Sequence, residues 1–298
     1  MKGSYDMLDH RYQTFLVLAT TKSYTQTARQ LYISQPAVSQ QIKSLEAELG
    51  VELVRYERPK LTITPAGVEL AAFVQRVQVQ ADAVVATLQH PQKVRQVTFS
   101  TTLSISEFLA PQLIGLLQAQ HYHEINCRVT NTHVALAAIE SGDSDFALIE
   151  GNFDKQRYGY EVVRQEPFVG VVAADHPLAQ QSAVSWADLT AYPLIVREEG
   201  SGSREILENL AHAANVTFAE FPQVVTVNNP TAIREVLLQG SGISFVYRSV
   251  VAEALKSGKL AVLPLQAGQL RHDLDLVYPR DSYFADDYRR WATALKKG

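Results

Sequence analysis

Apolar residues recur at helical spacing through residues 24–46, with one short polar interruption at residues 32–34. This pattern predicts two short helices that share a buried face and meet across a tight turn. Ser23 and Ser34 stand where a side-chain oxygen can cap the following helix, and Pro36 suits the first turn of the second helix. The arrangement is typical of a helix-turn-helix, whose second helix enters the DNA major groove.

The segments on either side of this motif complete a small domain. Residues 8–20 carry one apolar stripe and predict a first helix, and Gly50 suits the left-handed end of the last helix. Residues 51–67 alternate apolar and polar positions around a turn that contains Pro59, which predicts a two-stranded wing. Its basic tip suits contact with phosphate or the minor groove, although a plain solvated hairpin would show the same pattern.

The outer face of the second helix is polar and carries no acidic residue. Glutamine can read adenine in the major groove, while Ser, Thr and Lys bind phosphate or guanine. An ordinary helical hairpin with a solvated polar face is the alternative. The residues that we expect to contact DNA, including those of the wing, are Thr25, Ser34, Gln35, Pro36, Ser39, Gln40, Lys43, Arg55, Arg58 and Lys60.

Residues 65–89 form one uninterrupted helical stretch with an apolar seam. The seam residues follow steps of four and three alternately, as in a heptad repeat: Leu70, Val74, Val77, Ala81, Val84 and Leu88. A helix packed on its own domain could carry the same stripe, so the seam alone leaves both interpretations open. The segment from His90 to Lys93 contains a proline and predicts a hinge after the helix.

After the hinge, short apolar strands alternate with helices. The expected strands are Val97–Ser100, Ile125–Val129, Phe146–Ile149, Val169–Ala173, Leu194–Val196, Val224–Val227, Ile243–Val246 and Leu274–Val277, with helices at Ile105–Gln118 and Val134–Glu140. Such alternation predicts a mostly parallel sheet covered by helices on both faces. The number of strands exceeds what one small sheet holds, so we divide this region into two lobes.

Composition narrows the class of protein. The chain has 298 residues, enough for about two domains, and a net charge of −4. Residues 1–67 hold 8 basic and 6 acidic residues, whereas the remainder holds 19 and 25, which places a small basic end on an acidic body. Cys127 is the single cysteine, so no internal disulfide forms. No leader and no membrane-length apolar run is visible, and we expect a cytoplasmic protein without membrane contact.

The first part of the chain resembles the LysR-type transcriptional regulators. The resemblance is carried by an ordered set of residues at the family's spacing: Ala28, Leu31, Ser34, Gln35, Pro36, Ala37, Val38, Ser39, Ile42, Leu45, Glu46, Leu49, Gly50, Leu53, Arg58 and Thr64 to Gly67. Val54 departs from the family, which usually has Phe there, and Tyr56 stands where the family often has Arg. The resemblance implies a DNA-binding regulator that dimerises through its linker helix and often pairs again to a tetramer.

The rest of the chain resembles the same family over its full length. The matching positions are Phe108 to Pro111, Gly142 to Asp145, Asp175 to Leu178, Arg197 to Arg204 and Gly240 to Phe245. The resemblance implies a two-lobed α/β domain with the fold of type 2 periplasmic binding proteins, which holds a small effector, often a carboxylate, between its lobes. The expected organisation is a winged helix-turn-helix at 8–65 with its helix-turn-helix at 24–43, a linker and dimerisation helix at 66–90, and an effector domain at 94–298, with lobe I at 94–165 plus 269–298 and lobe II at 166–268.

Three loops of the expected effector domain have the chemistry of a ligand site, because each leaves a strand and opens a helix. Hydroxyl groups crowd the first, an amide and a hydroxyl occupy the second, and glycines that free backbone N–H groups for an anion occupy the third. Hydroxyls that merely cap helices and glycines that merely make turns would look the same. The residues that we expect to bind the effector are Thr101, Thr102, Ser104, Asn131, Thr132, Gly200, Ser201, Gly202, Ser203 and Asn229, with Arg197 and Arg204 as secondary contacts.

These observations favour a sequence-specific DNA-binding regulator controlled by a small, anionic effector. A solute-binding or transport component with the same two-lobed fold is the alternative, and it would need a leader peptide that the sequence does not show. No nucleophile–base pair or phosphate loop can be assembled, so we expect no enzyme activity and no cofactor. His121 and His123, with Glu124 beside them, superficially resemble metal ligands, but the segment precedes a strand at an exposed turn and we expect no metal.

Overall fold

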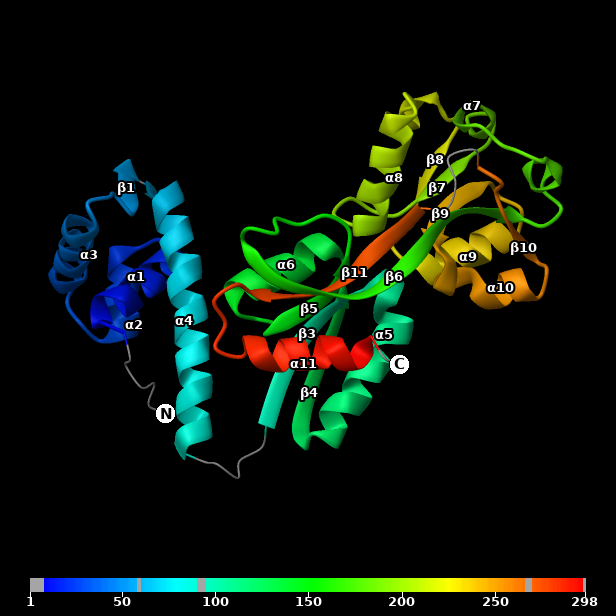
Figure 1. The fold of residues 1–298 in the computed structure, drawn as a ribbon. Coiled ribbons are helices and arrows are strands. Elements are labelled where there is room, and N and C mark those ends of the chain that lie inside the picture. Colours follow the sequence, from blue (N-terminus) through cyan, green and yellow to red (C-terminus); the bar gives the residue numbers. More distant parts are fainter. Residues whose placement is uncertain (1–7, 58–59, 90–94, 266–269, 297–298) are drawn as a thin grey trace. The chain divides into compact units, whose positions relative to one another are not determined.

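The computed structural model describes residues 8–57, 60–89, 95–265 and 270–296 (Figure 1). The chain divides into two compact units, one formed by residues 1–93 with 140–142 and the other by 94–139 with 143–298. The predicted hinge at His90 to Lys93 lies outside the described residues. No helix in the described part of the chain is long and apolar enough to cross a membrane.

The N-terminal unit begins with three helices, α1 (His10–Thr21), α2 (Tyr24–Leu31) and α3 (Gln35–Leu49). Ser23 and Ser34 accept hydrogen bonds from backbone N–H groups in the first turns of α2 and α3, as their positions in the sequence predict. Gly50 ends α3 in the left-handed conformation, with φ of 70°. The helix-turn-helix geometry therefore follows from local capping as well as from the shared apolar face.

A short hairpin follows the three helices and leads into one long helix. Strands β1 (Val54–Glu57) and β2 (Lys60–Ile63) pair antiparallel, and α4 spans Pro65–Gln89. Gly67, at the start of α4, has no side chain, and a Cβ there would collide with the carbonyl oxygen of Leu53. The hairpin and α4 are thus held in close contact with each other.

The core of the N-terminal unit is built from residues of all these elements. Its fully buried members are Phe15, Leu18, Ala28, Val38, Ile42, Leu45, Leu53 and Leu61. The small side chain of Ala28 lets α2 lie close to its neighbours, and α3 contributes one face of three residues at helical spacing. The opposite face of α3 is consequently left to solvent.

The C-terminal unit contains a nine-stranded mixed sheet with the order β4-β3-β5-β11-β6-β9-β7-β8, to which β10 is added beside β6. The strands are β3 (Arg95–Thr102), β4 (Tyr122–Thr130), β5 (Phe146–Glu150), β6 (Tyr158–Ala173), β7 (Leu194–Val196), β8 (Val224–Thr226), β9 (Ile243–Tyr247), β10 (Leu260–Val262) and β11 (Leu270–Pro279). Each half of the sheet, with its own helices, forms one lobe, and β6 and β11 run through both (Figure 1).

Helices cover the sheet in each lobe. The helices of the first lobe are α5 (Leu103–Ala119), α6 (Thr132–Ser141) and α11 (Ala285–Leu295). The helices of the second lobe are α7 (Trp186–Leu189), α8 (Gly202–Ala213), α9 (Pro230–Leu238) and α10 (Ala252–Lys256). The second lobe also contains the 3-10 turns η1 (Pro177–Gln180), η2 (Phe218–Glu220) and η3 (Arg248–Val251). Alternate residues of β5 point to opposite faces, so Phe146 and Leu148 pack in the main core while Ala147 and Ile149 pack beneath α6. This strand is therefore buried on both faces and ends at the boundary between the lobes.

The expectation of a mostly parallel sheet is wrong. Strands β3, β4 and β5 pair in parallel, as do β7, β8 and β9, but β11 is antiparallel to β5 and β6, and β6 is antiparallel to β9 and β10. The long strands β6 and β11 alternate polar and apolar residues where they cross between lobes, so only their apolar ends stand out in the sequence. The two parallel halves are joined by an antiparallel centre.

Candidate functional site

The outer face of α3 presents the polar residues that the sequence predicts for DNA contact. Gln35, Pro36, Gln40 and Lys43 are exposed and Ser39 is half-buried, while Val38, Ile42 and Leu45 face inward. Thr25 and Ser34 are exposed at the starts of α2 and of the turn before α3. In the wing, Arg55 and Lys60 are exposed, whereas Arg58 lies outside the described residues.

Polar contacts fix α3 against the elements around it. The Thr14 hydroxyl donates to the Gln41 side chain at 2.6 Å, and the Arg11 guanidinium lies 2.7 Å from the Glu48 carboxylate. At the other end of α3, Glu46 accepts backbone N–H bonds from Leu53 and Val54 at 2.8 and 3.1 Å. The recognition helix and the wing are therefore held as one rigid surface.

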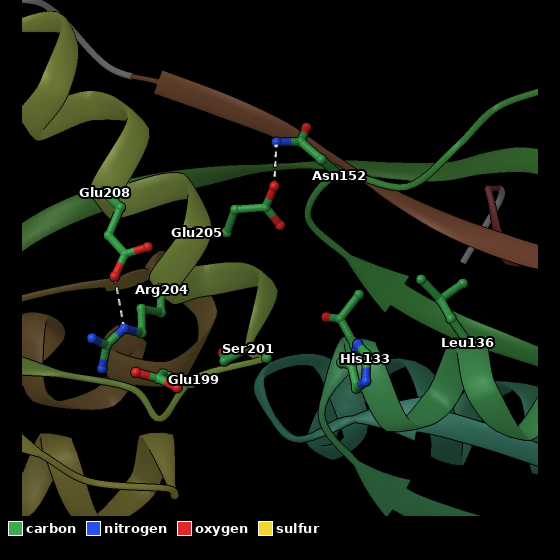
Figure 2. A pocket seen from close by; sticks show the side chains of 10 residues that line it. His133, Leu136, Asn152, Glu199, Ser201, Arg204, Glu205 and Glu208 are labelled. Carbon is green, nitrogen blue, oxygen red and sulfur yellow. Dashed lines mark hydrogen bonds and ion pairs between the residues drawn. The ribbon is translucent and has the colours of Figure 1, made fainter.

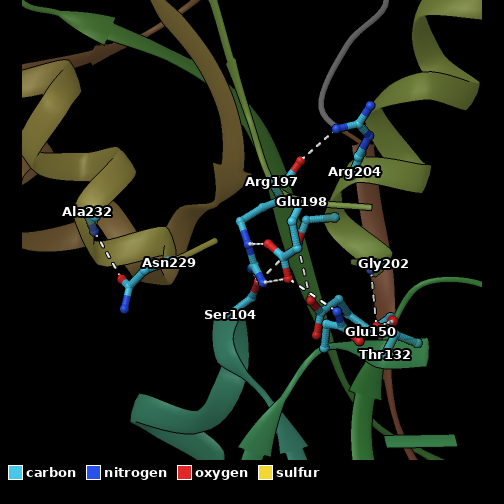
Figure 3. Close-up of polar contacts among 11 residues, drawn as sticks. Ser104, Thr132, Glu150, Arg197, Glu198, Gly202, Arg204, Asn229 and Ala232 are labelled. Carbon is cyan, nitrogen blue, oxygen red and sulfur yellow. Dashed lines mark hydrogen bonds and ion pairs between the residues drawn. The ribbon is translucent and has the colours of Figure 1, made fainter. Parts of the chain in front are cut away.

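In the C-terminal unit, polar groups from both lobes meet where β3, β5 and β7 end (Figure 3). The Thr102 hydroxyl donates to the Glu150 carboxylate, and the Ser203 hydroxyl donates to the same carboxylate at 3.2 Å. Ser104 lies 3.0 Å from Ser203 and accepts a 3.0 Å hydrogen bond from the Arg197 guanidinium. All five side chains are buried, so we call them the crevice cluster.

A second contact fastens α6 and α8 to each other beside this cluster. The Thr132 hydroxyl donates to the backbone carbonyl of Glu150 at 3.0 Å and accepts the Gly202 N–H at 3.1 Å. Gly202 has no room for a side chain, because a Cβ would press into the same Glu150 carbonyl. The start of α8, in the second lobe, is thus seated directly on the end of β5 in the first.

The buried Arg197 guanidinium interacts with two carboxylates: it binds Glu198 directly and acts on Glu150 through its charge. The Arg197 guanidinium binds Glu198 through two hydrogen bonds of 2.8 and 3.0 Å and also reaches Ser104. Burial raises the pKa of Glu150, while hydrogen bonds from Thr102 and the charge of Arg197 oppose that rise. Glu150 was not among the residues expected at the site, because an acid that ends an apolar strand carries no distinctive sequence signal.

An open pocket of about 360 Å³ adjoins the crevice cluster on the side of α6 and α8 (Figure 2). Thr132, His133 and Leu136 of α6 line one wall, and Gly200, Ser201 and Glu205 line the other. The Ser201 hydroxyl is buried, and no partner for it is present among the described residues. A buried hydroxyl without a partner beside a pocket is a natural contact for a bound molecule.

The structure brings together only part of the set expected to bind an effector. Thr102, Ser104 and Ser203 belong to the crevice cluster, Thr132 and Gly202 to the contact beside it, and Gly200 and Ser201 to the pocket. Asn131 caps α6 through the Val134 N–H and also donates to the Glu198 carboxylate at 3.5 Å, and Thr101 is buried on β3 with no described partner for its hydroxyl. Asn229 caps α9 through the Ala232 N–H at 3.0 Å and is exposed, turned away from the cluster (Figure 3).

The expected secondary contacts differ in their surroundings. Arg197 is buried at the centre of the cluster, whereas Arg204 lines the open pocket, where it binds Glu208 at 2.8 Å and donates to the Arg197 carbonyl at 3.1 Å (Figure 2). Within the described residues, no group of three His, Cys, Asp or Glu side chains could hold a metal ion. Cys127 is half-buried on β4, and burial raises the pKa of its thiol.

Both parts of the chain match models of known families. Residues 10–68 match the model described as "Bacterial regulatory helix-turn-helix protein, lysR family", and residues 90–298 match the "LysR substrate binding domain". The two matches together cover almost the whole sequence, with the linker helix between them.

Known proteins with this combination of parts are similar along their full length. The chain is 28% identical to the HTH-type transcriptional regulator CysL of Bacillus subtilis (strain 168), over 92% of this chain and 90% of that one. It is 30% identical to Rv2282c of Mycobacterium tuberculosis (strain ATCC 25618 / H37Rv), an uncharacterized HTH-type transcriptional regulator, over 90% and 89% of the two chains. The structure of full-length LysG from Corynebacterium glutamicum with bound effector Arg has the same fold, with a TM-score of 0.73, 16% identity and coverage of 98% and 99%.

Proposed function

This chain belongs to the LysR family of transcriptional regulators, and we propose that a small anion bound between the lobes of its C-terminal domain controls how it engages a promoter. As a LysR-type regulator it combines a DNA-binding helix-turn-helix with an effector-binding domain. The proposal concerns the position and charge of the effector, the assembly of the subunits and the residues that contact DNA.

For DNA, we propose that the outer face of α3 reads bases in the major groove while the wing contacts the backbone. The exposed side chains of Gln35 and Gln40 can each form paired hydrogen bonds with adenine, and Lys43 can bind phosphate. The acid-free surface of this face supports the assignment. The partner that we propose for this surface is double-stranded promoter DNA in the cytoplasm.

We propose further that two subunits join through α4, so that two recognition helices face one operator. Val68 and Phe73, which lie on α4 outside the predicted seam, expose 60% and 55% of their surface and support this interface, whereas Val74 of the seam is 3% exposed and Leu70 packs against the core of the N-terminal unit. Val77, Ala81 and Val84 of the seam are half-buried, and the side chain of Leu88 lies outside the described part of the chain. Pairing of two such dimers into a tetramer through the C-terminal domains is part of the same proposal.

For the effector, the single observation that carries the proposal is the meeting of both lobes at one polar crevice with an open pocket beside it. Residues from β3, α5 and α6 of the first lobe face residues from β7 and α8 of the second. A molecule that contacts both sides favours one arrangement of the lobes, and this difference in affinity is what can change DNA binding. The alternative of a transport component leaves the N-terminal DNA-binding unit without a role.

The anionic character of the effector is inferred from the donors in the crevice. Hydroxyl groups of Thr102 and Ser203 already hold a carboxylate that belongs to the chain itself, so the same donors suit an anion from solution. The unpaired Ser201 hydroxyl extends this donor set into the pocket.

The experiment measures binding of promoter DNA by the full-length protein in the presence of a panel of small organic and inorganic anions. We expect at least one anion to change operator affinity or the footprint, and Ser201→Ala or Thr132→Val to weaken that response. Ser182→Ala, which changes an exposed hydroxyl outside the crevice, is the matched control. A response that survives both crevice substitutions undiminished would place the effector elsewhere.

A further inference from the structure

The carboxylate of Glu150 lies where the donors for an anionic effector converge. Glu150 is the last residue of β5, and only 1% of its surface is exposed. Its two oxygens accept from Thr102 and from Ser203, which open helices on opposite lobes. The crevice is thus closed over a negative group that the chain supplies itself (Figure 3).

The hydrogen bonds of the crevice cluster have one consistent direction. The Arg197 guanidinium can only donate, so Ser104 accepts from it, and the Ser203 hydroxyl is used as a donor to Glu150. The remaining bond between the two serines is then donated by Ser104 to Ser203. A chain of donors therefore leads from the cation of one lobe through both serines to the carboxylate of the other.

We propose that the Glu150 carboxylate is an internal ligand of the effector crevice, and that an anion binds there in exchange for its negative charge, with uptake of one proton by Glu150. The inference rests on the proposed function, because it concerns the same crevice and the same class of effector. The proton comes from solvent and bonds to a Glu150 carboxyl oxygen, while the hydroxyls of Thr102 and Ser203 turn their donors to the incoming anion. For a monovalent anion the net charge of the crevice is the same before and after the exchange, whereas for divalent sulfate the proton offsets one of the two added charges.

The negative charge already present in the crevice opposes the binding of a further anion, so the anion has to be accompanied by a proton. Arg197 contributes one positive charge, and the carboxylates of Glu198 and of ionised Glu150, which accepts from Thr102 and Ser203, contribute two negative charges, so with Glu150 ionised the group has a net charge of −1. A further anion would raise this to −2 in a space closed to water, where like charges repel strongly. Protonation of Glu150 removes that repulsion, and it leaves the bidentate Arg197–Glu198 pair intact.

The surroundings of Glu150 favour proton uptake. Burial raises the pKa of Glu150, and the hydrogen bonds and Arg197 only oppose this effect. Among the described residues, the charged or titratable groups that face its carboxyl are Arg197 at the end of β7 and Tyr247 at the end of β9, while β3, α5, α6 and α8 present hydroxyls. The pKa of Tyr247 is raised well above its ordinary value, mainly by burial, so it stays neutral and Arg197 is the only counter-charge.

The test uses sulfate as the probe anion and the full-length protein, because sulfate does not itself titrate near neutral pH. For the wild type we expect sulfate affinity to rise as the pH falls, by up to about tenfold per pH unit over the range in which Glu150 takes up its proton, which is the limit for one coupled proton. Titration calorimetry in two buffers with different heats of ionisation should show close to one proton taken up per sulfate.

Glu150→Gln removes the charge and keeps the size of the side chain. We expect this variant to bind sulfate at least about tenfold more tightly than the wild type at about pH 8, with no dependence on pH. Glu253→Gln, which removes an exposed charge on α10, is the control and should behave like the wild type.

Two outcomes would overturn the internal-ligand proposal: sulfate binding to the wild type without proton uptake, or a folded Glu150→Gln variant that binds sulfate no more tightly than wild type or not at all. The proton count is measured on the wild type, so it remains decisive if the variant fails to fold. Failure of the proposed function looks different. In that case sulfate would bind with proton uptake as described, but no anion would change the binding of DNA.

Discussion

Asp275 offers a test of the electrostatics at the centre of the sheet. It lies on β11 between β5 and β6, at the point where the β11–β6 register shifts, and only 3% of its surface is exposed. Burial and the neighbouring charge of Asp273 raise the pKa of its carboxyl from 3.8 to about 7, against the opposing charge of Lys155. One carboxyl oxygen has no hydrogen-bond partner among the described residues.

The raised pKa fixes the sign of the effect on stability. The native state holds the proton of Asp275 more tightly than the unfolded chain does. Below about pH 4, where Asp275 is protonated in both states, its ionisation therefore does not lower the free energy of unfolding. The cost develops as the pH rises towards and through about 7. A difference of about 3 pKa units corresponds to about 4 kcal/mol, which is the upper limit of the stability lost by pH 8.

We therefore expect Asp275→Asn, which keeps the size and cannot ionise, to be more stable than the wild type by up to about 4 kcal/mol at about pH 8 and by almost nothing at about pH 4. Both tryptophans, Trp186 and Trp291, lie in the C-terminal domain, so urea unfolding followed by tryptophan fluorescence reports on that domain. Asp281→Asn, at an exposed position, should show no such dependence on pH.

The reasoning also predicts an intermediate variant. Asp273→Asn removes the neighbouring charge that raises the pKa of Asp275, so it should recover part of the stability at about pH 8. A constant difference between Asp275→Asn and the wild type across this range of pH would refute the argument, because it would show that Asp275 has the same pKa in the native and unfolded states.

Three further predictions concern DNA contact, assembly and packing. Gln35→Ala or Gln40→Ala should weaken specific binding by about 1–3 kcal/mol, and a footprint unchanged in both variants would exclude α3 as the base reader. Val77→Asp places a charge in the seam of α4 and should dissociate dimers of the full-length protein in sedimentation, whereas unchanged oligomers would exclude this interface. Gly202→Ala should destabilise the C-terminal domain by about 2 kcal/mol or more, because a Cβ there would press into the Glu150 carbonyl. The control Gly115→Ala, in open space on α5, should stabilise the domain by up to about 1 kcal/mol. Equal urea midpoints for the two variants would contradict the close packing of α8 on β5.

Much of the N-terminal unit could be predicted because its signals are local. Capping serines, a proline in a first turn and a glycine after the last turn each act within a few residues, and Ser23, Ser34 and Gly50 all act as expected. The apolar stripes identified α3 and its inner face. For the first helix the sequence predicts a buried stripe of Tyr12, Phe15, Leu16 and Ala19, whereas the structure also buries Leu18.

The site in the C-terminal domain depends on contacts across long stretches of sequence. Glu150 and Ser203 are joined only after the sheet has formed, and nothing near Glu150 in the sequence distinguishes it from an acid at any strand end. Asn229 and Thr102 both stand at the N-cap position of a helix, yet Asn229 caps its helix and Thr102 gives its hydroxyl to Glu150. The hydroxyl-rich loops could be predicted, but the partner of each hydroxyl could not.

The sheet has a mechanical consequence for the family's mode of control. Strands β6 and β11 belong to both lobes and are hydrogen-bonded along most of their length, so the lobes cannot separate without bending or twisting this pair. The interruption between Leu274 and Asp275 is where such deformation breaks the fewest bonds. An effector that rearranged the lobes would therefore have to deform this pair of strands, and the deformation energy would be subtracted from its affinity. By reciprocity, whatever makes this pair easier to bend tightens effector binding without touching the crevice.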